Sequence, residues 1–403
     1  MDLIPILKAL RRNKVGAILI GLQMAITLAV ACNCLSVIQQ YVESSTRPTG
    51  IDEANIFSFT NQWVGNSADV AARIQGDLSA IRQVPGVVDV QSTNSFPLRG
   101  GGWGWGLAVK PGQSPVSSTT LYFVDEHGLN TYGLKLVAGR WLGADEVTDH
   151  GMHDTSFPPS IVVTADLAHR LYPNGNGLGQ LVYWTATAPS RIVGVVERAQ
   201  TPWASFGGGD GGSMSSFLPY HFINTATFYV VRTRPGQRAG VMKAVQERLY
   251  SLSRQRIVDN VRTFAETRSF AYFRARATAV LLGSLAALLL GITVFGIIGL
   301  TMYWVGQRRR HIGMRRALGA RRLDILGYFH TENLIIAGTG VLLGFGLGIA
   351  SNLWLVSYFE MPRMNAAYIG WGALIILALS QAAVVWPALR AASTSPAIAT
   401  RGL

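Results

Sequence analysis

Charged residues and cysteines are both scarce in this sequence. Of its 403 residues, 14% are charged and 49% are hydrophobic, a balance that argues against a soluble protein and is typical of a membrane protein. The two cysteines, Cys32 and Cys34, lie within one apolar stretch. No disulfide is therefore expected in the rest of the chain, and a domain outside the membrane must depend on an ordinary hydrophobic core.

Sequence motifs of catalytic and metal sites are also missing. The phosphate-binding loop Gly-x-x-x-x-Gly-Lys-Ser/Thr, the nucleophile elbow Gly-x-Ser-x-Gly and the zinc helix His-Glu-x-x-His do not occur. Metal-ligating side chains stand together in one polar stretch, at Asp149, His150, His153 and Asp154. Two histidines three residues apart are common by chance, whereas a metal site needs a full set of ligands. We therefore predict no catalytic residue, no metal site and no cofactor bound by this chain.

Long apolar runs are abundant by contrast. Four stretches without an ionisable side chain are each long enough to cross a bilayer, which takes about 20 residues in a helix. They are Val15–Ile38, Ala277–Gln307, Asn333–Phe359 and Met364–Leu389. Because a charge at the centre of a bilayer costs about 3 kcal/mol or more, charge-free windows of this length predict four transmembrane helices.

The first apolar stretch also has features of a signal peptide, because it follows a basic start and places Ala29-Val30-Ala31 before Cys32. A lipoprotein signal normally has leucine or a similar residue where Ala29 stands, and the apolar run continues to Ile38. We therefore favour an uncleaved transmembrane helix over a signal peptide.

The positive charge is unevenly distributed. The chain has 35 Lys and Arg against 22 Asp and Glu, a formal net charge of +13, but residues 44–270 contain 19 basic and 17 acidic side chains. Most of the excess lies before the first apolar stretch, between the second and third, and after the fourth. These places share one side of a four-span topology, which the positive-inside rule makes the cytoplasm. We expect both termini in the cytoplasm, residues 44–270 in the periplasm, and contact with membrane lipids rather than nucleic acid.

Residues 44–270 show a repeated order of strand, helix and strand. A strand pattern at 55–60, apolar residues at helical spacing from Val70 to Ile81 and a strand pattern at 87–90 form the first copy, and the same order returns between residues 228 and 258. This duplicated β-α-β unit predicts an α+β domain with halves at about 50–96 and 227–265. The insertion between them, about 97–226, is predicted to contain mostly short strands and turns.

Two glycine runs in the insertion, Gly100–Gly106 and Gly207–Gly212, are interpreted as mobile loops. Trp103 and Trp105 in the first run either contact a ligand or a bilayer surface, or hold the loop against the domain. Glycine-spaced aromatic residues more often hold a loop in place, and we favour that interpretation.

The chain thus divides into three parts. Residues 1–43 are a cytoplasmic segment and the first span, residues 44–270 are the periplasmic domain, and residues 271–403 contain three further spans and a cytoplasmic loop at 307–331. From about Phe264, helical character returns and leads towards the second span. A helix that continued without a break into the membrane would act as a stiff lever, because its hydrogen bonds resist bending.

Small residues recur four positions apart in two spans. They are Gly283, Ala287 and Gly291 in the second span, and Gly340, Gly344 and Gly348 in the third. Such stripes let helices approach closely, so we assign both to helix packing. No ionisable residue lies deep in any span, which argues against an ion channel or a proton-coupled carrier.

The cytoplasmic loop between the second and third spans is the most informative segment. It contains the candidate coupling residues Arg308, Arg309, Arg310, Ile312, Gly313, Arg315, Arg316, Ala317, Leu318, Gly319 and Ala320. In the simplest interpretation its arginines bind anionic lipid. The spacing of Ile312, Arg315 and Arg316 also fits a short amphipathic helix that ends at Gly319, and such a helix suits a groove in a cytoplasmic partner.

This loop resembles the cytoplasmic signature of the FtsX-like permeases, and within them the MacB type. Arg-Arg-Arg-His-Ile-Gly-Met-Arg-Arg-Ala-Leu-Gly-Ala at 308–320 is similar to the family pattern R-x-x-E-I-G-I-R-R-A-L-G-A. His311 stands where the family usually has glutamate, which puts one charged contact in doubt. Glu332 matches the acidic residue that commonly opens the next span.

Other segments extend the resemblance over essentially the whole chain. Leu7–Lys14 resembles the amino-terminal start of the family, and Pro387–Ala392 with Ser395-Pro396 resembles its terminal motif. Residues 139–141, 162–168 and 192–196 of the periplasmic domain also fit.

The resemblance implies a permease dimer, of identical or homologous copies, paired with separate ABC ATPase subunits that bind ATP and Mg. Residues 308–320 would couple this chain to the ATPase in a complex of the bacterial inner membrane. Nucleotide-driven closure of the ATPase subunits in the cytoplasm would then move the periplasmic domains. The implied activity is export of peptides, antibiotics or toxins, with a periplasmic adaptor and an outer-membrane exit duct. The alternative is a mechanotransmission or signalling subunit that acts on a periplasmic enzyme, a sensor or a lipoprotein.

Overall fold

The computed structural model describes residues 14–65, 69–175, 177–204, 210–308, 312–314, 319, 321–359 and 364–392. The chain divides into two compact units. Residues 1–42 and 275–403 form the first, here called the helical unit, and residues 43–274 form the second, here called the outer domain.

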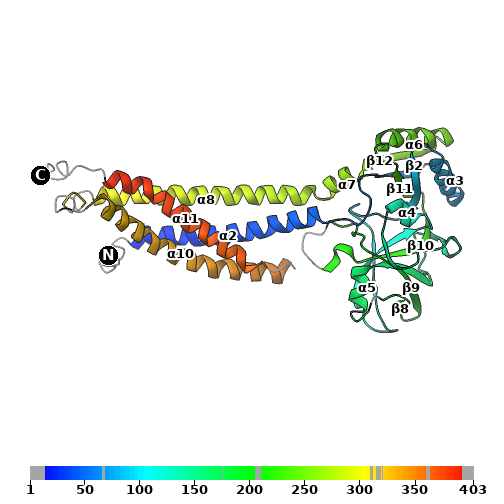
Figure 1. The fold of residues 1–403 in the computed structure, drawn as a ribbon, viewed down its shortest axis with the longest axis horizontal. Helices are drawn as coiled ribbons and strands as arrows, with labels where there is room; N and C mark the ends of the chain where they lie inside the picture. Colours follow the sequence, from blue (N-terminus) through cyan, green and yellow to red (C-terminus); the bar gives the residue numbers. More distant parts are fainter. Residues whose placement is uncertain are drawn as a thin grey trace. The chain divides into compact units, whose positions relative to one another are not determined.

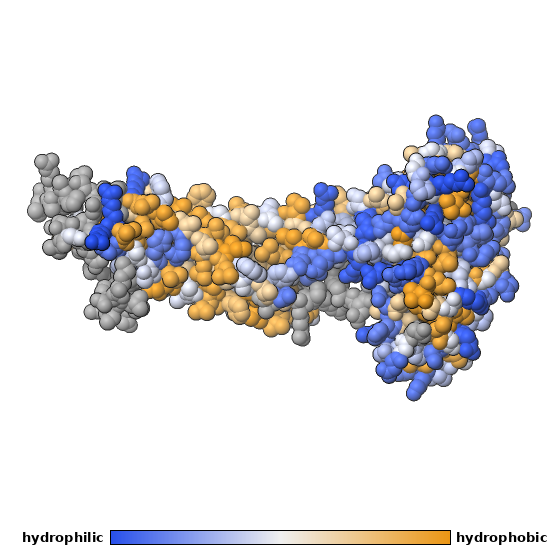
Figure 2. All heavy atoms as spheres, viewed as in Figure 1, coloured by the Kyte–Doolittle hydropathy of each residue, from blue (hydrophilic) through white to orange (hydrophobic). Residues whose placement is uncertain are grey.

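Long helices make up the helical unit (Figure 1). They are α2 (Lys14–Thr46), α8 (Phe273–Gln307), α10 (Arg322–Phe359) and α11 (Ala366–Ala392). All four are long and apolar enough to cross a membrane. Apolar residues cover much of the surface of this unit, whereas the surface of the outer domain is mainly hydrophilic (Figure 2). The helical unit is therefore suited to lipid and the outer domain to water.

Helix α2 supplies the centre of the helical core. Met24 and Leu28 are fully buried in one apolar cluster with Ile297 of α8, Ile336 of α10 and Ile376 of α11. A hydrogen bond of 2.9 Å between the hydroxyl groups of Thr27 and Thr293 also joins α2 to α8. Because neither hydroxyl group meets water in a bilayer, this bond gives each of them a hydrogen-bond partner.

The third-span glycines lie against α2. A Cβ atom on Gly340 would lie 2.7 Å from the backbone oxygen of Gly21, and one on Gly344 would lie 2.9 Å from that of Ala25. At Gly348 a Cβ atom would lie 3.7 Å from Cα of Ala29. Helices α2 and α10 therefore meet at backbone contact distance, which larger side chains would prevent.

The second-span stripe has a different environment. A Cβ atom on Gly283 would lie 3.6 Å from Ile38 of α2, whereas Ala287 is exposed and a Cβ atom on Gly291 would meet no atom within 4 Å in the described part of the chain. The packing role of Ala287 and Gly291 therefore stays a prediction. In this structure α8 contacts α2 through another face, which includes Ala286.

The expected unbroken helix into the second span is interrupted. Helix α7 (Phe264–Ala271) ends at Tyr272, and α8 begins one residue later. The Tyr272 hydroxyl donates a hydrogen bond of 2.7 Å to the Ser44 carbonyl and accepts one of 2.9 Å from Gln200. These contacts hold Tyr272 inside the outer domain at the break between α7 and α8, so the expectation of one continuous helix is wrong. The stiffness of this connection stays a prediction.

The first lobe of the outer domain contains the duplicated β-α-β unit. One copy consists of β1 (Ile56–Trp63), α3 (Val70–Arg82) and β2 (Val87–Thr93). The other consists of β11 (Ala226–Thr233), α6 (Arg238–Leu252) and β12 (Arg256–Thr263). Their strands form an antiparallel sheet in the order β12-β1-β11-β2, so the two copies interleave and the prediction of an α+β domain is confirmed.

The second lobe is the predicted insertion of mostly short strands. Its eight strands are β3 (Trp103–Leu107), β4 (Ser117–Val124), β5 (Leu136–Gly139), β6 (Thr148–Gly151), β7 (Ser160–Thr164), β8 (Leu181–Thr185), β9 (Ala188–Val196) and β10 (Ser215–Ile223). The main sheet order is β3-β4-β10-β7-β9-β5, with β6 on β10 and β8 on β9. The lobe also contains two short α-helices, α4 (Gly128–Tyr132) and α5 (Ala165–Leu171), and two 3-10 helices, η1 (Ala144–Glu146) and η2 (Asp210–Ser213).

The first glycine run is not a mobile loop as predicted, because β3 occupies residues 103–107 and pairs with β4. Its two tryptophans fix it. Trp103 packs edge-on against Phe123, and Nε1 of Trp105 donates a hydrogen bond of 2.9 Å to the Trp184 carbonyl. The favoured interpretation that these aromatic residues hold the segment in place agrees with these contacts. Residues 207–209 of the second run lie outside the described residues.

Candidate functional site

The predicted coupling segment is only partly described by the structure. Arg309, Arg310, His311, Arg315, Arg316, Ala317, Leu318 and Ala320 lie outside the described residues. Ile312 and Gly313 are buried in a short helical stretch, and the backbone nitrogen of Ile312 donates a hydrogen bond of 3.0 Å to the Arg308 carbonyl. Gly319 has a φ of +98°, a conformation that glycine adopts readily and that commonly ends a helix.

Arg308 anchors the beginning of this segment. It directly follows α8, and its Nη1 donates hydrogen bonds of 2.9 Å to Oε2 of Glu332 and 3.1 Å to the hydroxyl of Tyr328, both in α10. The Arg308 side chain is 17% exposed and that of Glu332 is 2% exposed. A buried ion pair of this kind is costly to break, because the remaining charge loses its partner. The pair therefore ties the end of α8 to α10 beside the loop.

Glu332 has one further property. Its second oxygen, Oε1, is buried without a hydrogen-bond partner in the described part of the chain. The sequence identified Glu332 only through the family resemblance, and its contact with Arg308 was not predicted.

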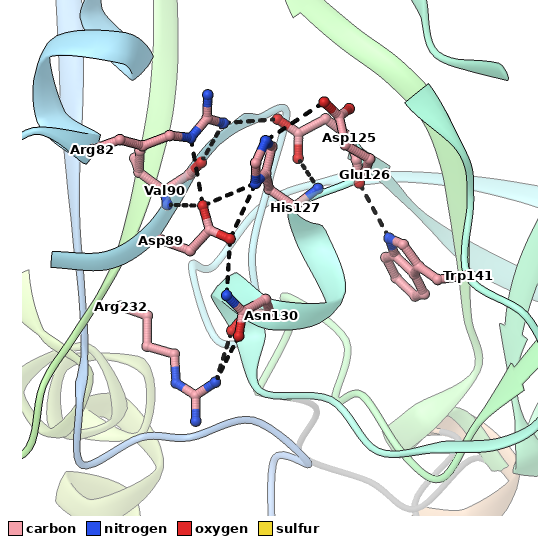
Figure 3. A network of polar contacts seen from close by, with 9 residues as sticks. All are labelled: Arg82, Asp89, Val90, Asp125, Glu126, His127, Asn130, Trp141 and Arg232. Carbon is pink, nitrogen blue, oxygen red and sulfur yellow. Dashed lines mark hydrogen bonds and ion pairs between the residues drawn. The ribbon is translucent and has the colours of Figure 1, made fainter. Parts of the chain in front are cut away.

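A polar network joins the two lobes of the outer domain (Figure 3). Asp89 of β2 lies at its centre, with Arg82 of α3 at 3.5 Å and Nδ1 of His127, from the second lobe, at 3.1 Å. Nδ2 of Asn130 in α4 donates a further hydrogen bond of 3.0 Å to Asp89. Arg82 also lies 3.7 Å from Asp125, which follows β4. The Asp89 carboxylate of the first lobe thus holds two residues of the second, His127 and Asn130.

The network continues on both sides of Asp89. Arg232 of β11 donates a hydrogen bond of 2.9 Å to the Asn130 carbonyl and another of 2.9 Å to Asp52. On the other side, Nε1 of Trp141 donates a hydrogen bond of 3.2 Å to the Asp125 carbonyl. Burial raises the pKa of the Asp125 carboxyl group to about 6, an effect that the nearby His127 opposes. Hydrogen-bonded buried groups of this kind favour a single arrangement of the two lobes.

A second cluster joins the two chain segments that enter and leave the outer domain. Arg268 of α7 donates hydrogen bonds of 2.8 Å to the Ser45 carbonyl, 3.2 Å to the Arg47 carbonyl and 3.1 Å to Glu53. Together with the Tyr272 contact to Ser44, these bonds fasten residues 44–53 to residues 268–272. We call this cluster the Arg268 clasp.

No catalytic arrangement is apparent among the residues that the structure describes. Groups of three or more His, Cys, Asp or Glu side chains that could hold a metal do not occur within these ranges. In the polar stretch that the sequence singled out, His150 is buried and stacks on Tyr220 with ring centroids 4.2 Å apart, whereas His153 and Asp154 are exposed. These side chains therefore do not form a metal-ligand set.

The chain matches two protein-family models. Residues 21–249 match the family described as MacB-like periplasmic core domain, and residues 283–396 match the family described as FtsX-like permease C-terminal. The first match covers more than half of the chain.

Individual relatives are distant in sequence. The uncharacterized ABC transporter permease YvrN of Bacillus subtilis (strain 168) is 25% identical over 304 residues, which cover 71% of each chain. The macrolide export ATP-binding/permease protein MacB of Chromobacterium violaceum is 22% identical over 374 residues, which cover 87% of this chain and 53% of that protein. This chain thus spans about half the length of that MacB relative.

Among solved structures, the periplasmic region of MacB from Actinobacillus actinomycetemcomitans aligns with a TM-score of 0.34 and 20% identity. The alignment covers 52% of this chain and 90% of that one.

Proposed function

This chain belongs to the FtsX-like permeases that carry a MacB-like periplasmic core domain, and on that premise we propose that it transmits ATP-driven motion from the cytoplasm to the periplasm. The four apolar helices and the MacB-like domain fit a multi-pass protein of the inner membrane. In this proposal an ABC ATPase subunit binds residues 308–320, and two permease copies, identical or homologous, move their outer domains together.

The observation that carries the proposal is the position of the coupling segment. It begins at Arg308, whose side chain is already committed to Glu332 and Tyr328 of α10. A partner that pulls or pushes this segment therefore acts on α8 and α10 at once. The remaining arginines of the segment supply positive charge for docking, while ATP and Mg are bound by the ATPase, since residues 1–403 contain no phosphate-binding loop.

The outer domain is built to receive this motion as one body. The Asp89 network holds its two lobes together. The Arg268 clasp joins residues 44–53, where the chain enters the domain, to residues 268–272, where it leaves. Movement at either segment is then shared by both lobes. We propose that the moving domains drive export of peptides, antibiotics or toxins through a periplasmic adaptor and an outer-membrane exit duct.

The second candidate function keeps the same mechanics and changes the output. In it, the outer domain acts on a periplasmic enzyme, a sensor or a lipoprotein, and nothing is exported. The clasp and the network favour mechanical transmission in both cases. Loss of export in a deletion strain supports the first function, whereas unchanged export with loss of periplasmic enzyme activity or signalling supports the second.

Docking is tested by reversing charge within the coupling segment. Arg315→Glu with Arg316→Glu is expected to abolish co-purification of the chain with its ATPase. The matched control is Arg321→Glu with Arg322→Glu, which makes the same change in charge at two exposed positions just beyond the segment. Retained binding and normal ATP turnover in the first double variant would overturn the assignment, as would equal loss in both.

A further inference from the structure

The second lobe contains a cavity that the proposed function does not use. Its volume is about 310 Å³, at the small end of the range for ligand pockets. It is lined by residues of β3, β4, β6 and β10 and by the segment that follows β6. Two motifs that lie far apart in the sequence meet here, namely the Trp103–Trp105 pair and the polar stretch that contains His150 and Asp154.

Five of the twelve lining residues are Phe, Tyr or Trp. Phe123 and Tyr220 are buried, and Trp103 packs edge-on against Phe123 with ring centroids 5.3 Å apart. Trp105 is 45% exposed at the opening and packs edge-on against Phe157 at 5.2 Å. The hydrogen bond from its indole nitrogen to the Trp184 carbonyl fixes this ring. Since the rings are already held in place, a ligand pays little to order them.

The charge of the lining is acidic. Asp154 lies at the exposed rim, and its carboxylate accepts a hydrogen bond of 2.7 Å from the backbone nitrogen of Gly151. The described lining residues include no lysine or arginine. Burial lowers the pKa of the His150 imidazole, so this ring stays neutral at neutral pH and adds no competing positive charge.

These features select one class of ligand. Aromatic faces attract cations because their π electrons present negative charge, and a carboxylate at the same opening adds a direct electrostatic attraction. We propose that this cavity binds a small organic cation, whose apolar ring enters among the aromatic side chains while its ammonium group stays at the rim beside Asp154. A neutral aromatic ligand gains only the free energy of burying its ring, and the Asp154 carboxylate repels an anionic ligand. The proposal is independent of whether the chain acts in export or in signalling.

Three naphthalene probes that differ in charge test the proposal, namely 2-naphthylmethylamine, 2-naphthylmethanol and 2-naphthoate. Each is titrated by calorimetry into the full chain in lipid nanodiscs at pH 7.5. The amine is expected to bind about tenfold more tightly than the alcohol, and the naphthoate more weakly than both. Equal affinities for the amine and the alcohol, or no binding of the amine, would overturn the proposal.

Two exposed aspartates of the same stretch provide a matched pair of variants. Asp154→Asn keeps an oxygen that accepts from Gly151 but removes the charge, so it is expected to reduce the preference for the amine to about threefold or less. Asp149→Asn makes the same change at a residue that does not line the cavity, and it is expected to keep the tenfold preference. Trp105→Leu is expected to weaken the binding of both the amine and the alcohol. Equal effects of the two aspartate variants would contradict the site.

Discussion

Arg308 and Glu332 are separated by 24 residues in the sequence, yet Nη1 of the arginine lies 2.9 Å from Oε2 of the glutamate. The contact joins the end of α8 to α10 where the loop between these two helices begins. In the proposed function, a force on this loop reaches both helices, because Arg308 directly follows α8 and its side chain is bonded to α10.

Breaking this pair from one side is predicted to destabilise the helical unit. Arg308→Met leaves Glu332 buried without its cation, at a cost of about 3–5 kcal/mol before Glu332 takes up a proton. The thermal unfolding of the full chain in nanodiscs should therefore shift to lower temperature. Arg308→Met with Glu332→Gln removes both charges and should recover most of the loss. Unchanged unfolding of the single variant would show that the pair is not structural.

The glycine face of α10 predicts a difference between two neighbouring positions. Gly344→Ala forces a methyl group to within 2.9 Å of the Ala25 backbone oxygen and 3.0 Å of Leu28 Cβ, which overpacks the contact with α2. Overpacking typically costs about 1–3 kcal/mol. At Gly346 the added Cβ meets no atom within 4 Å in the described part of the chain.

Thermal unfolding of the two alanine variants in nanodiscs checks this difference. Gly344→Ala should unfold at a lower temperature than the unmodified chain, and Gly346→Ala should not. The close approach of α2 and α10 would be refuted by equal stability of the two variants.

The Arg268 clasp predicts where the outer domain loosens first. Arg268→Ala removes the donors that bind the carbonyl groups of Ser45 and Arg47 and the carboxylate of Glu53. Hydrogen exchange at residues 44–53 should become faster while the central strands keep their protection. Arg254→Ala, at an exposed position, serves as the control and should leave exchange at 44–53 unchanged. No difference between the variants would mean that the clasp does not hold this segment.

His150 predicts a pH dependence of stability. Burial lowers the pKa of its imidazole below the ordinary value of 6.5, so the unfolded chain binds this proton more readily than the folded chain. The stabilisation is complete above about pH 6.5 and is lost as the pH falls through the lower pKa of the folded state. Asp154 favours the charged ring and reduces the effect.

Unfolding of the chain at pH 7.5 and pH 5 measures this effect. His150→Gln should show a smaller loss of stability on acidification than the unmodified chain, because one buried titrating group has been removed. His153→Gln, at an exposed position of the same stretch, should retain the full loss. If His150→Gln responds to acid as strongly as the unmodified chain, the burial of His150 does not contribute.

Local patterns in the sequence predicted the four spans and the duplicated β-α-β unit. The apolar periodicity from Val70 to Ile81 predicts the buried face of α3. The absence of charged residues from Ala277 to Gln307 predicts a membrane-spanning helix, and α8 is long and apolar enough to be one. Contacts between distant residues leave no such pattern. Asp89 and His127 are 38 residues apart, and neither residue alone indicates a network between lobes. The break at Tyr272 was missed for the same reason, because it depends on Ser44 and Gln200.

In the proposed function, ATP turnover in the cytoplasm moves the outer domains. Lys243 lies on α6 with its side chain 81% exposed, so a spin label at Lys243→Cys, with Cys32 and Cys34 replaced by alanine, reports on the outer domain. In the complex with the ATPase, double electron–electron resonance spectroscopy measures the distance between the spin labels of two copies of the chain. We predict different distances in the nucleotide-free and ATP-bound states, and no difference when Arg315 and Arg316 are both changed to glutamate. The same distance in both states of a complex that binds ATP would contradict this mechanism.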